Sequence, residues 1–142
     1  PSARGSIFGI TRGTTRAHLA RAVVEAMAYQ TRDVVDAMRN ASGASLRQLR
    51  VDGGAAVMDL LLQIQADQLN CEVLRSSVAE TTALGAAYMA GLGAGVWTTA
   101  AEIESNWAND ATFGPNTDRS AADAGYALWK RGVTRSLNWA ED

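Results

Sequence analysis

The sequence predicts an α/β fold in which a short, mostly parallel sheet is flanked by long helices. Three observations support this prediction: short apolar runs alternate with segments of helical periodicity, two glycines join one such run to the next helix, and capping residues mark the helix ends. Alternating strands and helices require crossover connections, which are typical of parallel sheets. Three strands leave sheet edges uncovered, so we expect them to belong to a larger sheet.

The first expected elements are a strand at Ser6–Ile10 and a long helix. The strand is the apolar run SIFGI. The helix is expected to begin after the capping residue Thr14 or Thr15, to end near Asn40, and to be stopped by Gly43 in a left-handed conformation. Its apolar stripe has helical spacing and comprises Ala20, Val23, Met27, Val34 and Met38.

The middle of the chain predicts a strand, a tight turn, a helix and a second strand. Leu46–Val51 is the first strand, and the turn Asp52–Ala55, with the sequence DGGA, follows at once. Apolar residues at helical spacing run from Met58 to Leu69. Cys71–Leu74 is the next expected strand.

The last part of the chain predicts three helices and a loop. A helix rich in glycine and alanine spans Glu80–Ala94. Thr99–Glu102 and Ser120–Asp123 each have the spacing of a capping box, the first for a short helix and the second for the final one. The segment Asn109–Thr117, which contains glycine and proline, is expected to be a loop. The final helix has an apolar stripe of Tyr126, Trp129, Val133 and Leu137.

Composition excludes several classes of function. The chain has 13 basic and 15 acidic residues, a net charge of −2, so no strong field attracts nucleic acid or an anionic membrane. The apolar stretch Ala83–Val96 is shorter than the roughly 20 residues that a membrane-spanning helix needs. One histidine and one cysteine exclude an internal disulfide and a metal cluster of these ligands. His18 is expected to be a surface or capping residue, and Cys71 suits the reducing cytoplasm.

The turn at Asp52–Ala55 is the segment most suggestive of chemistry. A strand that enters two glycines and then a helix places backbone N–H groups where an anion or a polar ring could approach closely. A tight turn without a ligand explains the same residues, and spacing alone leaves both interpretations open. Gly91–Val96 resembles a dinucleotide fingerprint, but it lacks the last glycine and follows a helix, so close helix packing explains it better.

Several segments resemble one family. Gly5–Glu25, with the sequence GSIFGITRGTTRAHLARAVVE, resembles the C-terminal signature of the FGGY carbohydrate kinases. VDGGA, QIQADQL and ETTALGAAYMAGL fit the same pattern, and TRGTTRAH and AYQTRDV are similar to the glycerol-directed branch of this family. The resemblance covers nearly the whole chain and weakens after about Val96.

This resemblance implies a fold and an activity. Residues 1–142 would form the C-terminal nucleotide-binding lobe of an actin-like (ribonuclease H-like) ATPase, truncated at its N-terminal side, with 97–142 as a helical cap of that lobe. The complete enzyme would use ATP and Mg²⁺ to phosphorylate glycerol and would be a homo-oligomer. Because the glycerol pocket and the general base have no counterpart here, we expect the 142-residue chain alone to be inactive and to contain no catalytic residue or metal ligand.

The resemblance also assigns nucleotide-binding residues. Gly53, Gly54, Ala55 and Met58 would contact ATP on its adenosine and phosphate side. The family usually has asparagine at the position of Met58; Asp59 follows it, and a carboxylate near ATP needs a metal or a cation. The alternatives are the lobe of another FGGY sugar kinase, and a non-catalytic helical interaction module of kinase ancestry.

Overall fold

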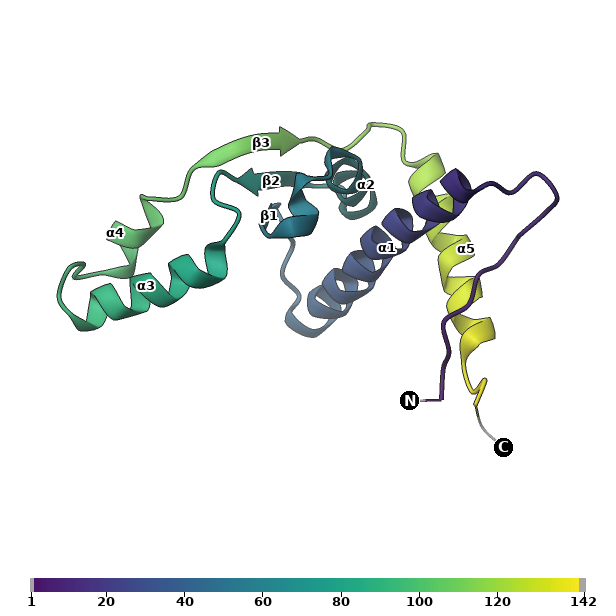
Figure 1. The fold of residues 1–142 in the computed structure, drawn as a ribbon, viewed down its shortest axis with the longest axis horizontal. Coiled ribbons are helices and arrows are strands. Elements are labelled where there is room, and N and C mark those ends of the chain that lie inside the picture. Colours follow the sequence, from purple (N-terminus) through teal and green to yellow (C-terminus); the bar gives the residue numbers. More distant parts are fainter. Residues whose placement is uncertain (1, 141–142) are drawn as a thin grey trace.

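The computed structural model describes residues 2–140, which form five α-helices, one short 3-10 helix and a three-stranded sheet (Figure 1). In chain order these elements are α1 (Arg16–Ser42), β1 (Gln48–Val51), η1 (Gly54–Val57), α2 (Asp59–Leu69), β2 (Glu72–Ser76), α3 (Thr81–Gly93), α4 (Ala100–Glu104), β3 (Asn109–Phe113) and α5 (Ser120–Ser136). The predicted α/β class is confirmed. The sheet has one parallel and one antiparallel pair of strands, in the order β1-β2-β3.

The central strand of the sheet is β2. It pairs in parallel with β1, where Val51 faces Arg75, and antiparallel with β3, where Val73 faces Phe113. The prediction of a loop over Asn109–Thr117 is wrong for its first half, which is β3. This segment is short and polar, so its backbone pairing with β2 determines its conformation rather than any hydrophobic pattern of its own.

The expected strand at Ser6–Ile10 is wrong. These residues form an extended segment that pairs with no strand of the described residues 2–140. Gly9 interrupts the segment with a φ of 81°. The segment runs beside α5 (Figure 1), and a Cβ on Gly132 would lie only 3.3 Å from the ring of Phe8. Strand propensity without a neighbouring strand does not form a ladder.

Local signals correctly predicted both ends of α1. The N-cap is Thr15, whose N–H donates to Nδ1 of His18 at 3.1 Å, so the histidine has the expected capping role. Gly43 ends the helix with a φ of 68°, and its N–H donates to Arg39 O at 2.8 Å. The helix has 27 residues and supports one side of the core.

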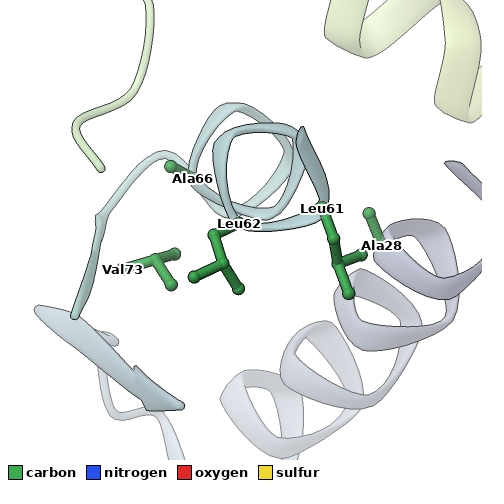
Figure 2. Packing of buried hydrophobic residues seen from close by; sticks show 5 residues of the cluster. All are labelled: Ala28, Leu61, Leu62, Ala66 and Val73. Carbon is green, nitrogen blue, oxygen red and sulfur yellow. The ribbon is translucent and has the colours of Figure 1, made fainter. Parts of the chain in front are cut away.

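The hydrophobic core lies between the sheet, α2 and α1. Figure 2 shows Leu62 of α2 pointing toward Val73 of β2, and Leu61 lying beside Ala28 of α1. Ala66 completes this buried cluster. The core therefore holds α2 between the sheet and α1, which fixes the position of the turn that precedes α2.

Polar contacts dock α5 on α1. Asp33 of α1 accepts hydrogen bonds from the Tyr126 hydroxyl (2.6 Å) and from Trp129 Nε1 (2.7 Å). Burial, followed by the bond to Asp33, raises the pKa of Tyr126 to about 12. The expected capping box at Ser120–Asp123 is wrong, because Asp123 pairs with Arg32 of α1 at 3.1 Å. A charged partner from another helix outcompetes the local backbone for this carboxylate.

Helix α4 has the N-terminal cap that the sequence predicts. The Thr99 hydroxyl accepts from the N–H of Glu102, and the Glu102 carboxylate accepts from the N–H and hydroxyl of Thr98. The bonds from Thr98 lower the pKa of Glu102.

In Figure 1, α3 and α4 extend away from the helices α1 and α5, on the other side of the sheet.

Candidate functional site

The glycine turn connects β1 to α2. After β1, Gly53 has φ 84° and ψ 178°, η1 follows, and Met58 is the N-cap residue of α2. The N–H of Gly53 donates to Ala79 O (3.1 Å), and the N–H of Ala56 donates to Gly53 O (3.0 Å). The turn is therefore held to the loop that follows β2, and it is anchored on its other side by α2.

The two glycines of the turn are subject to different constraints. Gly53 has a positive φ that residues with a side chain rarely adopt. Gly54 has no such φ, and a Cβ built on it would meet no atom of the described part of the chain, residues 2–140, within 4 Å. Packing among these described residues therefore does not require glycine at position 54, and the space beside it is open.

An open cavity of about 510 Å³ lies at the carboxyl ends of β1 and β2. Its lining combines residues of the turn, the end of β2 and the start of β3, namely Asp52, Gly53, Ala56, Val57, Asp59, Arg75, Ser76, Ser77, Ala79 and Asp110. Ligands of open α/β sheets bind outside the carboxyl ends of the parallel strands. The cavity therefore lies where this class of fold places its ligands.

Charge in the cavity is dominated by carboxylates. Three aspartates and one arginine give its lining a net charge of −2. Arg75 Nη1 lies 2.7 Å from Asp59 Oδ1, and Arg75 Nε lies 2.7 Å from Asp110 Oδ2. The Asp59 contact, followed by the Asp110 contact, raises the pKa of Arg75. The third carboxylate, that of Asp52, accepts a hydrogen bond from the Thr81 hydroxyl at the start of α3.

The predicted nucleotide-binding residues have different surroundings. Gly53 lines the cavity, and Gly54 and Ala55 are exposed at the start of η1. Met58 is half-buried and packs against the core cluster of Figure 2, outside the cavity lining. Asp59, the neighbour of Met58, lines the cavity and has a cation beside it in Arg75.

Arg75 and Asp110 line the cavity but were not predicted from the sequence as site residues. Arg75 directly follows the predicted strand Cys71–Leu74, and it lies near the end of β2 where the glycine turn also lies, which is a signal that could have been used. Asp110 offered no signal, because its segment was expected to be a loop. The two residues are 35 positions apart, and only the antiparallel pairing of β2 with β3 brings them together.

Residues 2–140 contain neither a metal-binding cluster nor a helix that could span a membrane. No group of three or more His, Cys, Asp or Glu side chains in this part of the chain is placed to hold a metal ion. None of its helices has both the length and the apolar character needed to cross a membrane.

Comparison with known proteins relates the chain to carbohydrate kinases. A glycerol kinase of Dechloromonas aromatica is 55% identical over 140 residues, which are 99% of this chain and 28% of the relative. One of Saccharolobus islandicus is 51% identical over 141 residues, again 99% of this chain and 28% of the relative. The chain thus spans less than a third of the length of these curated relatives.

Solved structures agree with this relationship. The crystal structure of Plasmodium falciparum glycerol kinase with ADP has a TM-score of 0.81 and 34% identity, over 95% of this chain and 27% of that one. A ligand-bound xylulose kinase from Lactobacillus acidophilus, 23% identical, shares the fold with a TM-score of 0.74, over 94% of this chain and 27% of that one.

The family model matches most of the chain. Residues 1–94 match the C-terminal domain of the FGGY family of carbohydrate kinases, which is well over half of the 142 residues. The chain belongs to the FGGY family of carbohydrate kinases.

Proposed function

We propose that this chain is the nucleotide-binding C-terminal lobe of a glycerol kinase, which transfers the γ-phosphoryl group of MgATP to glycerol and forms sn-glycerol 3-phosphate. The observation that carries the proposal is the glycine turn beside an open cavity at the carboxyl ends of β1 and β2. Two observations support it: the glycerol kinases that are 55% and 51% identical to this chain, and the similar fold of a glycerol kinase whose structure contains ADP.

The residues of the turn fit a nucleotide. Gly53, Gly54 and Ala55 would hold it through their backbone, because no bulky side chain blocks the open space at Gly54. The carboxylates of the cavity repel phosphate, so its lining suits the uncharged nucleoside better. Met58 packs on the core but is only half-buried, so its remaining exposed part would add an apolar contact with the base. MgATP, when bound, supplies the phosphoryl group and the charge of the metal ion.

In this proposal the chain contributes binding and positioning. Phosphoryl transfer depends mainly on alignment and charge neutralisation, so a rigid nucleotide lobe is itself a catalytic requirement. The core that anchors α2, together with the bond from Gly53 to Ala79, supplies this rigidity. The glycerol pocket and the general base are proposed to lie in the rest of the protein.

The first test measures glycerol-dependent ATP consumption and product formation by the full-length protein and by the 142-residue chain. We expect activity in the full-length protein and none in the chain alone. Preference for a pentose or another polyol would favour a different FGGY kinase. Absence of phosphorylation with every acceptor, in a folded protein, would favour a non-catalytic interaction module.

The proposed contact of Met58 with the base predicts a change in nucleotide preference. In the full-length enzyme, Met58→Asn should raise the ratio of kcat/KM for ATP to that for GTP several-fold, because one neutral hydrogen bond contributes about 0.5–1.5 kcal/mol. Met58→Leu is the matched control, since it keeps the apolar contact with the core. An unchanged ratio in Met58→Asn, together with lower thermal stability, would assign Met58 to the core alone.

Three further features complete the proposal. Residues 97–142, which contain α4, β3 and α5, would form a cap on the lobe. Self-association is supported by apolar side chains of α1 that remain exposed outside the hydrophobic core, such as Val23 and Met38. The buried, unpaired thiol of Cys71 supports a reducing compartment, the cytoplasm.

A further inference from the structure

We propose that Arg75 is a positioning residue of the nucleotide site, which holds η1, and with it Gly54 and Ala55, in the orientation that binds ATP. This inference rests on the proposed nucleotide-binding function. It concerns a residue that contacts the turn rather than the nucleotide itself.

The contacts of Arg75 join three elements around the cavity. Its Nη1 donates to Ala56 O within η1 (3.3 Å) and to Asp59 Oδ1 at the start of α2 (2.7 Å). Its Nε donates to Asp110 Oδ2 on β3 (2.7 Å). Its Cζ lies 5.7 Å from the ring centroid of Phe113, also on β3. One planar side chain therefore connects the turn to two strands of the sheet.

The position of Arg75 in β2 makes these contacts rigid. Arg75 pairs with Val51, the last residue of β1, and with Ala111 of β3. The register of β2 and β3 shifts directly after it, between Arg75 and Ser76. Its side chain is only 20% exposed, so packing as well as hydrogen bonding restricts its rotamers.

Arg75 is poorly suited to bind phosphate directly. Two carboxylates already surround its single positive charge, so the Asp59–Arg75–Asp110 cluster has a net charge of −1. A phosphate would have to compete with both of them. The contact with Ala56 O, by contrast, acts on the backbone of η1. Positioning through the turn is therefore the role that the contacts support.

Lysine cannot reproduce this arrangement. The guanidinium offers five N–H donors in a fixed plane, whereas an ammonium is a compact point charge. Arg75→Lys thus keeps the charge and removes the fork that reaches Ala56, Asp59 and Asp110 at once. The substitution separates geometry from charge.

Arg32 provides a matched control. Its side chain is 17% exposed, and it too joins elements that are distant in sequence: its Nη1 contacts Gln68 Oε1 (2.9 Å) on α2 and Asp123 Oδ1 (3.1 Å) on α5. It lies outside the cavity lining. Arg32→Lys should therefore reproduce the structural loss of Arg75→Lys without touching the turn.

The experiment compares wild type, Arg75→Lys and Arg32→Lys in the full-length kinase, by steady-state kinetics with both substrates and by calorimetric titration with ADP. Arg75→Lys should raise KM for ATP and Kd for ADP by about tenfold, the effect of losing a charge-assisted hydrogen bond. KM for glycerol should stay within about twofold, because the loss is confined to the nucleotide side. Arg32→Lys should leave all three constants unchanged.

The other outcomes overturn either the positioning role of Arg75 or the proposed function of the chain. An Arg75→Lys enzyme with wild-type KM for ATP and wild-type ADP affinity overturns the positioning role, even if its melting temperature falls as far as that of Arg32→Lys. If Arg75→Lys does not fold, Asp110→Ala replaces it, because this substitution removes the acceptor of the Arg75 Nε bond and the Asp110 side chain is 52% exposed, away from the core; an unchanged KM for ATP in this variant equally overturns the role. A wild-type protein that neither binds ADP nor phosphorylates glycerol refutes the proposed function instead.

Discussion

Replacing Gly54 by valine in the full-length kinase is expected to raise KM for ATP by at least about tenfold, while KM for glycerol stays nearly unchanged. The reason is steric. A Cβ at position 54 meets no atom of residues 2–140 within 4 Å, so the new side chain would enter the open space that the nucleotide is proposed to use. A β-branched side chain also stiffens the start of η1.

A second exposed glycine provides the control for this experiment. Gly114 follows β3 at the opposite end of the sheet from the cavity, and a Cβ built on it also meets no described atom within 4 Å. Gly114→Val should leave both Michaelis constants unchanged. Thermal unfolding of both variants checks that they fold. A folded Gly54→Val enzyme with wild-type KM for ATP would show that the turn is structural and does not bind the nucleotide.

Leu62→Ala is expected to lower the free energy of unfolding by about 2–5 kcal/mol, the range for leucine deletions in packed cores. Leu62 of α2 is 1% exposed, and its side chain points toward Val73 of β2 (Figure 2). Its removal would leave a cavity where the sheet and α2 meet. Urea unfolding of the chain, followed by far-ultraviolet circular dichroism, measures the change.

Leu60 is the matched control on the same helix. Its side chain is 45% exposed, so Leu60→Ala should lower the free energy of unfolding by less than about 1 kcal/mol. Equal losses in the two variants would contradict the placement of the core between α2 and the sheet. A large loss in Leu62→Ala alone would support it.

Much of the local structure was predictable from the sequence. The ends of α1 follow from Thr15, His18 and Gly43, which are neighbours of the backbone groups that they cap. Gly53 occupies a positive φ at the predicted turn, and α2 ends at Asn70 in the left-handed conformation. These signals are short-range, so the residues that determine them lie within a few positions of each other.

Strands were less predictable, because a strand depends on its partner. Ser6–Ile10 has the composition of a strand but pairs with no strand in residues 2–140. Asn109–Phe113 has little strand character and pairs with β2. Composition describes what a segment tolerates, while the hydrogen bonds of a ladder come from elsewhere in the chain.

For this protein, the sequence by itself determined the α/β class, the ends of α1, the glycine turn and the resemblance to FGGY kinases, because each depends on residues close together in the chain or on contiguous motifs. Only the tertiary structure decided which side chains surround the turn. It packed Met58 on the core and brought Arg75 between Asp59 and Asp110, 16 and 35 positions away. Such contacts depend on the register of β2 with β3 and on the packing of α2, which arise only when the whole chain folds.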